Sequence, residues 1–141
     1  MLLGLVGSEM CIRDRPMAVG KRNHQLVICL PGNPVATFVC YRLIVAPLLD
    51  HLQCGSVSNP LRIALPVLFR HTKSENRAEY LRARLVQDKD GKTCIDSYGR
   101  KGAGVISSLT GADGLVEIPI ENLGVEPGMF LNFLPFMERC L

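Results

Sequence analysis

A short turn rich in proline and glycine stands where a strand is expected to end and a helix to begin. It reads Pro31-Gly32-Asn33-Pro34 and follows the apolar run LVICL at residues 26–30. Asn33 suits a helix N-cap, and Pro34 suits the first helical position, which needs no N–H donor. Amides at a helix N-terminus, with the positive end of the helix dipole, bind anions. The turn therefore predicts a phosphate or oxyanion pocket that Gly32 opens to the ligand, although plain connecting turns use the same residue types.

Basic side chains are densest between residues 62 and 84. The residues concerned are Arg62, Arg70, Lys73, Arg77, Arg82 and Arg84. Such a run usually forms the solvated face of a sheet, and the more specific alternative is that one or two members bind an anion. The net charge of +3 is too small to indicate a nucleic-acid partner without a concentrated patch. The absence of Trp also leaves few surfaces on which bases could stack.

Cysteine and histidine give no sign of a metal site. The six cysteines include no C-x-x-C pair, and no histidine stands at metal-ligand spacing from them. This usage fits a reducing cytoplasm better than a disulfide-bonded scaffold. His24, His51 and His71 lack an acidic partner at motif spacing, which indicates surface or capping roles. Asp113-Gly114 reads as a turn rather than as a Mg²⁺ ligand.

The first part of the chain predicts a strand, a tight turn and a helix. Residues 26–30 read as a buried, parallel strand because the run is continuous, apolar and rich in β-branched residues. Apolar residues at helical spacing extend from the turn to about Gln53, where Gly55 provides a stop. Pro47 falls inside this pattern and should kink or split the helix. The result is half of a βαβ unit, an α/β remnant whose sheet must lie elsewhere.

After a polar linker at residues 56–60 the pattern changes to short strands separated by turns. The residues 88–91 (DKDG) are a hairpin signal, with glycine where a positive φ is needed. Several short strands in about 80 residues predict a small all-β barrel or sandwich. The expected strands are residues 61–69, 79–87, 93–98, 114–119 and 129–135.

Residues 1–15 (MLLGLVGSEMCIRDR) resemble the translation of sequencing-adapter DNA fused to a reading frame. We exclude them from fold reasoning. The alternative is a genuine N-terminal helix. Their apolar start is too short for a signal peptide or a membrane span.

Several motifs in order resemble the molybdopterin molybdenumtransferases, the family that includes the enzymatic part of gephyrin. The clearest is LPGNPVATFVCYRLIVAPLLDHL at residues 30–52, which is similar to the family's LPGNPVS motif and following helix. The resemblance runs from about Pro16 to Leu141. The other matching stretches are PMAVG at 16–20, EYLR at 79–82, SSL at 107–109 with ADGL at 112–115, and residues 128–135.

The resemblance implies the C-terminal piece of a four-domain enzyme. Residues 16–55 would end the molybdopterin-binding α/β domain, and residues 56–141 would form the C-terminal β-barrel domain. Family members insert molybdate into adenylylated molybdopterin and release AMP, with assistance from Mg²⁺. The resemblance also implies a cytoplasmic homodimer with small-molecule substrates and with no nucleic-acid or membrane partner.

The family's site residues carry over at two places. Pro31, Gly32, Asn33 and Pro34 match the turn that borders the pterin or molybdate pocket, and Arg82 matches the arginine of E-F-x-R, which helps to bind molybdate. A guanidinium suits this role because it presents paired donors to an oxyanion. The alternative for Arg82 is an ordinary surface arginine on a strand.

Departures from the family pattern limit what can be expected of the chain alone. The catalytic lysine of the family's PGK motif is replaced by Arg15, and Ala36 and Ala103 stand where the family has serines. The family's catalytic carboxylates belong to upstream sequence, so we name no catalytic residue and expect the fragment to be inactive. Two alternatives stay open: a non-catalytic barrel module for protein interaction or scaffolding, and a relative that acts on another oxyanion.

Overall fold

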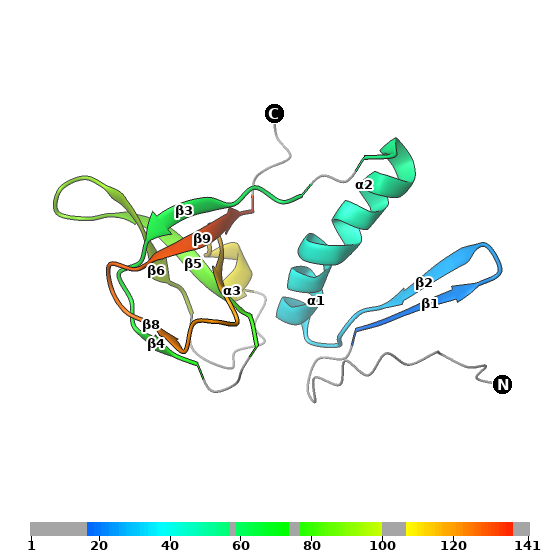
Figure 1. Cartoon of the computed structure of the whole chain (residues 1–141), viewed down its shortest axis with the longest axis horizontal. Helices are drawn as coiled ribbons and strands as arrows, with labels where there is room; N and C mark the ends of the chain where they lie inside the picture. Colours follow the sequence, from blue (N-terminus) through cyan, green and yellow to red (C-terminus); the bar gives the residue numbers. More distant parts are fainter. Residues whose placement is uncertain (1–16, 57–58, 74–76, 100–106, 137–141) are drawn as a thin grey trace. The chain divides into compact units, whose positions relative to one another are not determined.

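The computed structural model describes residues 17–56, 59–73, 77–99 and 107–136. The chain divides into two compact units, Met1–Ser58 and Asn59–Leu141, and each is described by itself. The first holds a hairpin and a long helix, and the second holds the remaining strands (Figure 1).

A two-stranded antiparallel hairpin opens the first unit. Strand β1 (Ala18–Arg22) pairs with β2 (Gln25–Cys29), and Asn23 in the turn between them has a φ of 54°. The expected buried, parallel strand at residues 26–30 is therefore wrong, because Leu26 and Val27 are 44% and 49% exposed. A short apolar run indicates a strand but not its direction, and a tight turn lets it pair with its sequence neighbour.

The helix that follows is interrupted where the sequence places a proline. It comprises α1 (Pro34–Cys40), a π-helical turn η1 (Tyr41–Val45) and α2 (Ala46–Cys54). Pro47 lacks an N–H, and its ring would crowd the preceding helical turn. The backbone hydrogen bonds before it therefore change to the π-helical pattern, in which the Ala46 N–H donates to the Tyr41 carbonyl five residues earlier. Gly55 ends the helix with a φ of 70° and donates to the His51 carbonyl at 2.9 Å. The N-cap at Asn33, the break at Pro47 and the stop at Gly55 are confirmed.

This helix is unusually apolar for one that is mostly uncovered in the structure. Within Pro34–Cys54 the most apolar window of 18 residues has a mean hydropathy of 1.5, and 17% of that window is buried. Its 21 residues would be long enough to cross a bilayer. Core helices of soluble proteins share these properties, so the helix is weak evidence for a membrane and the absence of a membrane partner stays a prediction.

The second unit is a five-stranded antiparallel sheet in the order β3-β9-β7-β5-β6. Its two edges meet where Val67 bridges Ile95 and the Leu68 N–H donates to the Ile95 carbonyl at 2.9 Å, which nearly closes the barrel. The small β-barrel after an α/β remnant, predicted from the sequence, is confirmed. The strands are β3 (Ile63–Pro66), β5 (Glu79–Gln87), β6 (Thr93–Ser97), β7 (Gly114–Ile118) and β9 (Phe130–Pro135).

Three smaller elements complete the unit and have no counterpart in the sequence predictions. Strands β4 (His71–Thr72) and β8 (Gly124–Val125) form a separate antiparallel pair, and α3 (Ser107–Thr110) precedes β7. Each has four residues or fewer, which is too short for a periodic pattern to reveal.

One face of each central strand packs into the barrel core. On β5, Ala83 is fully buried and Leu81 packs against the core cluster, while Tyr80, Arg82 and Arg84 alternate with them on the opposite face. The core is aliphatic apart from two phenylalanines. Its buried members are Val67, Phe69, Ala83, Ile95, Val116, Ile118, Val125, Leu131 and Phe133.

The turn between β5 and β6 is organised by one carboxylate. Asp88 Oδ1 accepts the N–H groups of Asp90 at 2.9 Å and Lys92 at 2.8 Å. Gly91 supplies a φ of 76°, which few other residues adopt at low cost. The hairpin expected from DKDG is confirmed.

We predict that Gly114→Ala strongly destabilises the barrel. A Cβ there would lie 2.4 Å from the Leu134 carbonyl oxygen and 2.5 Å from Phe133 Cζ, so β7 and β9 would have to separate. Overpacking of this kind typically costs about 1–3 kcal/mol and occasionally more. Urea unfolding measures the loss. The control is Gly91→Asn, where a Cβ meets nothing within 4 Å and asparagine tolerates the positive φ. Equal stabilities of the two variants would contradict the prediction.

Candidate functional site

The predicted anion turn uses its own donors within the chain. Asn33 Oδ1 accepts the N–H groups of Val35 at 3.0 Å and Ala36 at 3.3 Å, and the Thr37 N–H reaches the Asn33 carbonyl at 2.8 Å. The Thr37 hydroxyl donates to the carbonyls of Asn33 and Pro31. Since Pro34 has no N–H, the first amides of the helix are all committed. An anion here would rely on the amides of the turn itself or displace Asn33.

Gly32 leaves the outer side of this turn open. A Cβ at Gly32 would meet nothing within 4 Å among the described residues, and its φ lies outside the left-handed region. Its backbone is exposed, whereas Pro31 beside it is buried. Neither sterics nor conformation within the chain explains a glycine at this position, so close approach by a ligand or another segment remains a sufficient reason for it.

Arg82 lies on the outer face of β5 and is half-buried. Gly99, with a φ of 94°, passes so close that a Cβ would lie 3.3 Å from Arg82 Nη2. The Arg82 carbonyl accepts the Tyr98 N–H at 2.8 Å. The guanidinium is therefore engaged with its surroundings and is not a freely solvated surface charge. Residues 31–34 form one turn in the first unit, whereas Arg82 belongs to the second unit. The two predicted groups of site residues are therefore described separately.

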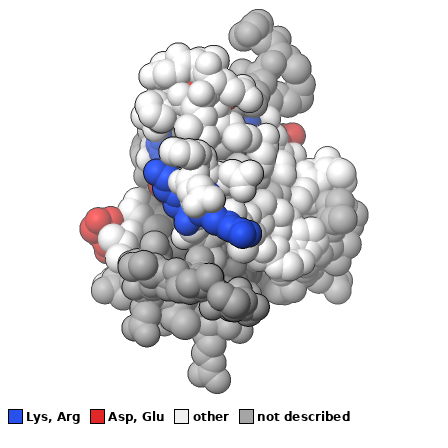
Figure 2. All heavy atoms as spheres, turned by 90° about the vertical axis from the view of Figure 1, so that its right-hand side faces the viewer, with Lys and Arg blue, Asp and Glu red and all other residues white. Residues whose placement is uncertain are grey.

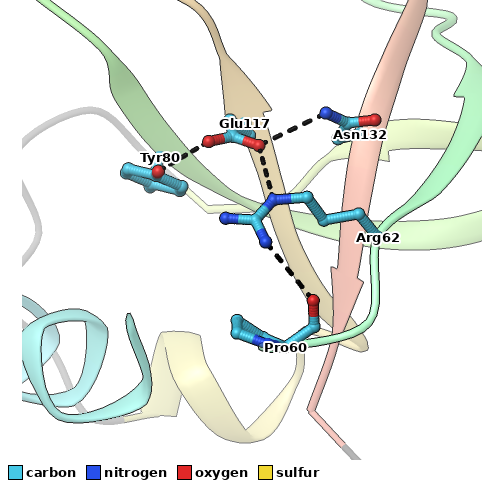
Figure 3. Close-up of polar contacts among 5 residues, drawn as sticks. All are labelled: Pro60, Arg62, Tyr80, Glu117 and Asn132. Carbon is cyan, nitrogen blue, oxygen red and sulfur yellow. Dashed lines mark hydrogen bonds and ion pairs between the residues drawn. The ribbon is translucent and has the colours of Figure 1, made fainter. Parts of the chain in front are cut away.

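A polar cluster that the sequence did not reveal lies on the same face, centred on Glu117 of β7 (Figure 3). Glu117 Oε1 accepts the Tyr80 hydroxyl at 2.7 Å, and Oε2 accepts Arg62 Nε at 3.1 Å and Asn132 Nδ2 at 3.3 Å. Arg62 also donates to the Pro60 carbonyl at 3.4 Å. Tyr80, Glu117 and Asn132 are direct cross-strand partners on β5, β7 and β9. Only the strand register brings them together, so spacing along the chain gave no signal.

The cluster shifts the ionisation of two of its members. Burial and the hydrogen bond to Glu117 raise the pKa of the Tyr80 hydroxyl to about 12, so the phenol stays protonated at neutral pH. Burial opposes ionisation of Glu117, but the hydrogen bonds from Tyr80, Arg62 and Asn132 outweigh it and lower the pKa of this carboxyl. The ionised carboxylate therefore links four segments of the barrel.

Most of the basic run at residues 62–84 serves contacts within the barrel. Arg70 pairs with Glu126 at 2.7 Å, and Lys73 Nζ donates to the carbonyls of Pro119 at 2.6 Å and Ile120 at 3.0 Å. Figure 2 shows one face of the molecule, where Lys and Arg atoms gather mainly in one narrow group among uncharged atoms. That face carries no broad basic surface among the described residues.

His71 departs from the surface or capping role that the sequence indicated for it. Its Nε2 lies 2.7 Å from Glu79 Oε2, and both side chains are largely buried. The two residues are eight positions apart and meet because β4 lies near the start of β5. This separation matches no helical or strand-period motif, which is why the pair escapes sequence analysis.

The described residues do not provide a ready site for Mg²⁺. In the described ranges no three His, Cys, Asp or Glu side chains come together. The Asp113 carboxylate, the candidate at the ADGL segment, accepts the Leu85 N–H at 2.9 Å. Mg²⁺ demands several oxygen ligands in octahedral geometry, and the described residues do not fit this requirement.

The fold and the polar face define the class of the molecule: a small antiparallel β-barrel domain with an arginine-bearing outer face, joined to a unit that ends in a long helix. Residues 64–136, more than half of the chain, match the family model described as MoeA C-terminal region (domain IV). The chain belongs to this family.

Relatives in other organisms extend the likeness beyond the barrel. The chain is 27% identical over 111 residues to molybdenum cofactor synthesis protein cinnamon of Drosophila melanogaster, covering 74% of this chain and 18% of that protein. It is 24% identical over 123 residues to molybdopterin molybdenumtransferase of Haemophilus influenzae, covering 86% and 30%. The chain therefore spans less than a third of the length of either relative.

Solved structures show the same fold. The molybdopterin biosynthesis moeA protein of Pyrococcus horikoshii matches with a TM-score of 0.69 at 21% identity, over 89% of this chain and 30% of that one. A molybdenum cofactor biosynthesis protein of Pyrococcus furiosus matches with a TM-score of 0.66 at 25% identity, over 89% and 42%.

We predict that Glu117→Gln lowers barrel stability at neutral pH by about 1–3 kcal/mol, because it removes the charge that three donors share. The lowered pKa makes the unfolded chain bind the proton first as pH falls below the ordinary value of 4.5. The stabilisation by ionised Glu117 is therefore present at neutral pH and is lost as the pH falls. The difference in stability between the wild type and Glu117→Gln should shrink accordingly at acid pH. Urea unfolding at neutral pH and at about pH 3 measures both effects.

Glu126→Gln is the matched control for this variant, since its carboxylate pairs with Arg70 on the exposed surface. Such pairs contribute about 0–1 kcal/mol. If the two substitutions changed stability and its pH dependence equally, the central role of Glu117 would be wrong.

Proposed function

We propose that this chain acts in molybdenum cofactor biosynthesis as the C-terminal region of a molybdopterin molybdenumtransferase. That enzyme would insert molybdate into adenylylated molybdopterin and release AMP. The observation that carries the proposal is the family match over residues 64–136, the span that contains Arg82. The name of the Haemophilus influenzae relative, which aligns with 86% of the chain, supports the reaction.

In this proposal Arg82 contacts the molybdate oxyanion. Its guanidinium offers parallel donors that match an oxyanion, and its partly buried position strengthens each charge-assisted hydrogen bond. The turn at residues 31–34 would border the pterin or molybdate pocket, with Gly32 giving close backbone access. The Glu117 cluster would keep the strand register on which the position of Arg82 depends.

We further propose that turnover requires parts of the enzyme outside the span shared with the relatives. The chain aligns with only 18% and 30% of the two relatives' lengths, and the family resemblance places the catalytic carboxylates upstream of the motifs that match here. The working enzyme would be a cytoplasmic homodimer that uses Mg²⁺ and small-molecule substrates, without nucleic acid or membrane.

We predict that Arg82→Ala weakens molybdate binding by roughly 10- to 100-fold, the usual contribution of a charge-assisted bidentate contact. Isothermal titration of the full chain with molybdate, and with tungstate as an analogue, measures the affinity. Arg70→Ala is the matched control, because it removes an exposed arginine of the same barrel whose partner is an exposed glutamate. Equal affinities for the two variants would remove Arg82 from the site.

A second prediction concerns the turn. Gly32→Ala should leave stability unchanged, because the new Cβ meets nothing within 4 Å. It should nonetheless weaken binding of adenylylated molybdopterin, measured by equilibrium dialysis, if a ligand approaches the backbone there. Val19→Ala, a substitution on the exposed hairpin, is the control. Unaltered binding by Gly32→Ala would assign the turn a purely connecting role.

A second candidate function is a non-catalytic barrel module for protein interaction or scaffolding. Its support is that the core cluster consists only of residues of the second unit, and that Phe130 is 69% exposed on β9. Failure of the chain to bind molybdate and tungstate would favour this module, or a relative that takes another oxyanion.

A further inference from the structure

The segment that joins β6 to β7 is fastened at both ends to the same stretch of β5. At its start, the Tyr98 N–H donates to the Arg82 carbonyl at 2.8 Å. At its end, the Asp113 N–H donates to the Ala83 carbonyl at 2.9 Å, and the Asp113 carboxylate accepts the Leu85 N–H at 2.9 Å. Three residues of β5, all between Arg82 and Leu85, therefore hold both ends of this connection.

Arg84 adds side-chain contacts with Tyr98 and Gly111, together called the Arg84 clasp, to these backbone hydrogen bonds. Its guanidinium carbon lies 3.9 Å from the centre of the Tyr98 ring, and its Nε donates to the Gly111 carbonyl. Gly111 lies directly against the ring, since a Cβ there would come within 2.2 Å of the Tyr98 hydroxyl oxygen. A planar guanidinium can stack on an aromatic face and donate in its own plane at once, which an ammonium cannot do.

The clasp fixes the residue that contacts Arg82. Gly99 follows Tyr98 directly, and its left-handed backbone, with a φ of 94°, turns it against Arg82. Because Gly99 is bonded directly to Tyr98, contacts that hold Tyr98 also restrain the backbone that lies beside the Arg82 guanidinium.

We propose that Arg84 is a positioning residue: with Tyr98 and Gly111 it holds the Arg82 guanidinium in one orientation for an oxyanion. The part that concerns the oxyanion rests on the proposed function. The physical reason is preorganisation, because a long side chain ordered before binding loses less entropy when the ligand arrives. Arg84 also lies two residues from Arg82 on the same face of the strand, at about 7 Å, and adds to the positive potential there.

The test compares three variants of the full chain: Arg84→Lys, Tyr98→Leu and Tyr98→Phe. The lysine keeps the charge but loses the stacking plane and the Nε donor, and leucine removes the aromatic face. Phenylalanine keeps the ring and serves as the matched control. The first readout is the ¹⁵N relaxation of the Arg82 Nε–H group, assigned by its absence from Arg82→Lys.

We expect the Arg82 Nε–H group to be more mobile in Arg84→Lys and Tyr98→Leu than in the wild type. In Tyr98→Phe its mobility should equal that of the wild type. The second readout, molybdate affinity, should weaken by about two- to fivefold in the first two variants, the contribution of an exposed cation–π contact. Backbone amide spectra of the β5–β6 hairpin report whether each variant is folded. Should Arg84→Lys not fold, Gly111→Ala displaces the ring instead, because the added Cβ would clash with the Tyr98 hydroxyl.

Unchanged relaxation of Arg82 in both disruptive variants would overturn the positioning role. A separate outcome concerns the proposed function: if Arg82→Ala binds molybdate like the wild type, the oxyanion role fails even where the relaxation data support the clasp. Increased Arg82 mobility together with weaker molybdate binding supports both.

Discussion

The period-two alternation of β5 is the constraint on which the second unit depends. Its even-numbered and odd-numbered side chains face opposite ways, so Leu81 and Ala83 fill the barrel while Tyr80, Arg82 and Arg84 face outward. The strand pairs with both β6 and β7, and a slip of one residue would bury the arginines. Burying an unpaired guanidinium is prohibitively unfavourable, so the charges enforce the register as firmly as the apolar residues do.

On the outer face of the sheet, the strand register determines which polar side chains contact one another. Tyr80, Glu117 and Asn132 are opposite one another only when β5, β7 and β9 are paired as observed, and Arg62 joins them from the chain before β3. Arg84 similarly reaches Tyr98 and Gly111. Arginines that composition alone would assign to a solvated face thus hold separate strands together. Arg82 lies between these two groups on the strand, so it is surrounded by residues whose positions are already fixed.

Local signals in the sequence predicted the elements that local chemistry decides. Asn33 and Gly55 act within one turn of the helix they bound, and the Asp88 turn closes through contacts of two to four residues. β5 begins and ends where alternation placed it. The direction of β2, the His71–Glu79 pair and the Glu117 cluster depend on which strands become neighbours, and no pattern along the chain determines that. Arg82 is a candidate only through the family resemblance, and its neighbours on the outer face could be named only once the strand register was known.

The turn at residues 31–34 and Arg82 differ in what each offers an anion. At the turn, Asn33 and the backbone already satisfy the first helical amides, so the helix dipole contributes field but few free donors. Arg82 offers a full positive charge, partly withdrawn from water and held against Gly99. Coulomb attraction grows as the effective dielectric constant falls, so a partly buried guanidinium attracts an oxyanion more strongly than an exposed one. Charge therefore makes Arg82 the stronger attractor for an oxyanion, whereas the turn offers an open backbone at Gly32 and little unsatisfied hydrogen-bonding capacity.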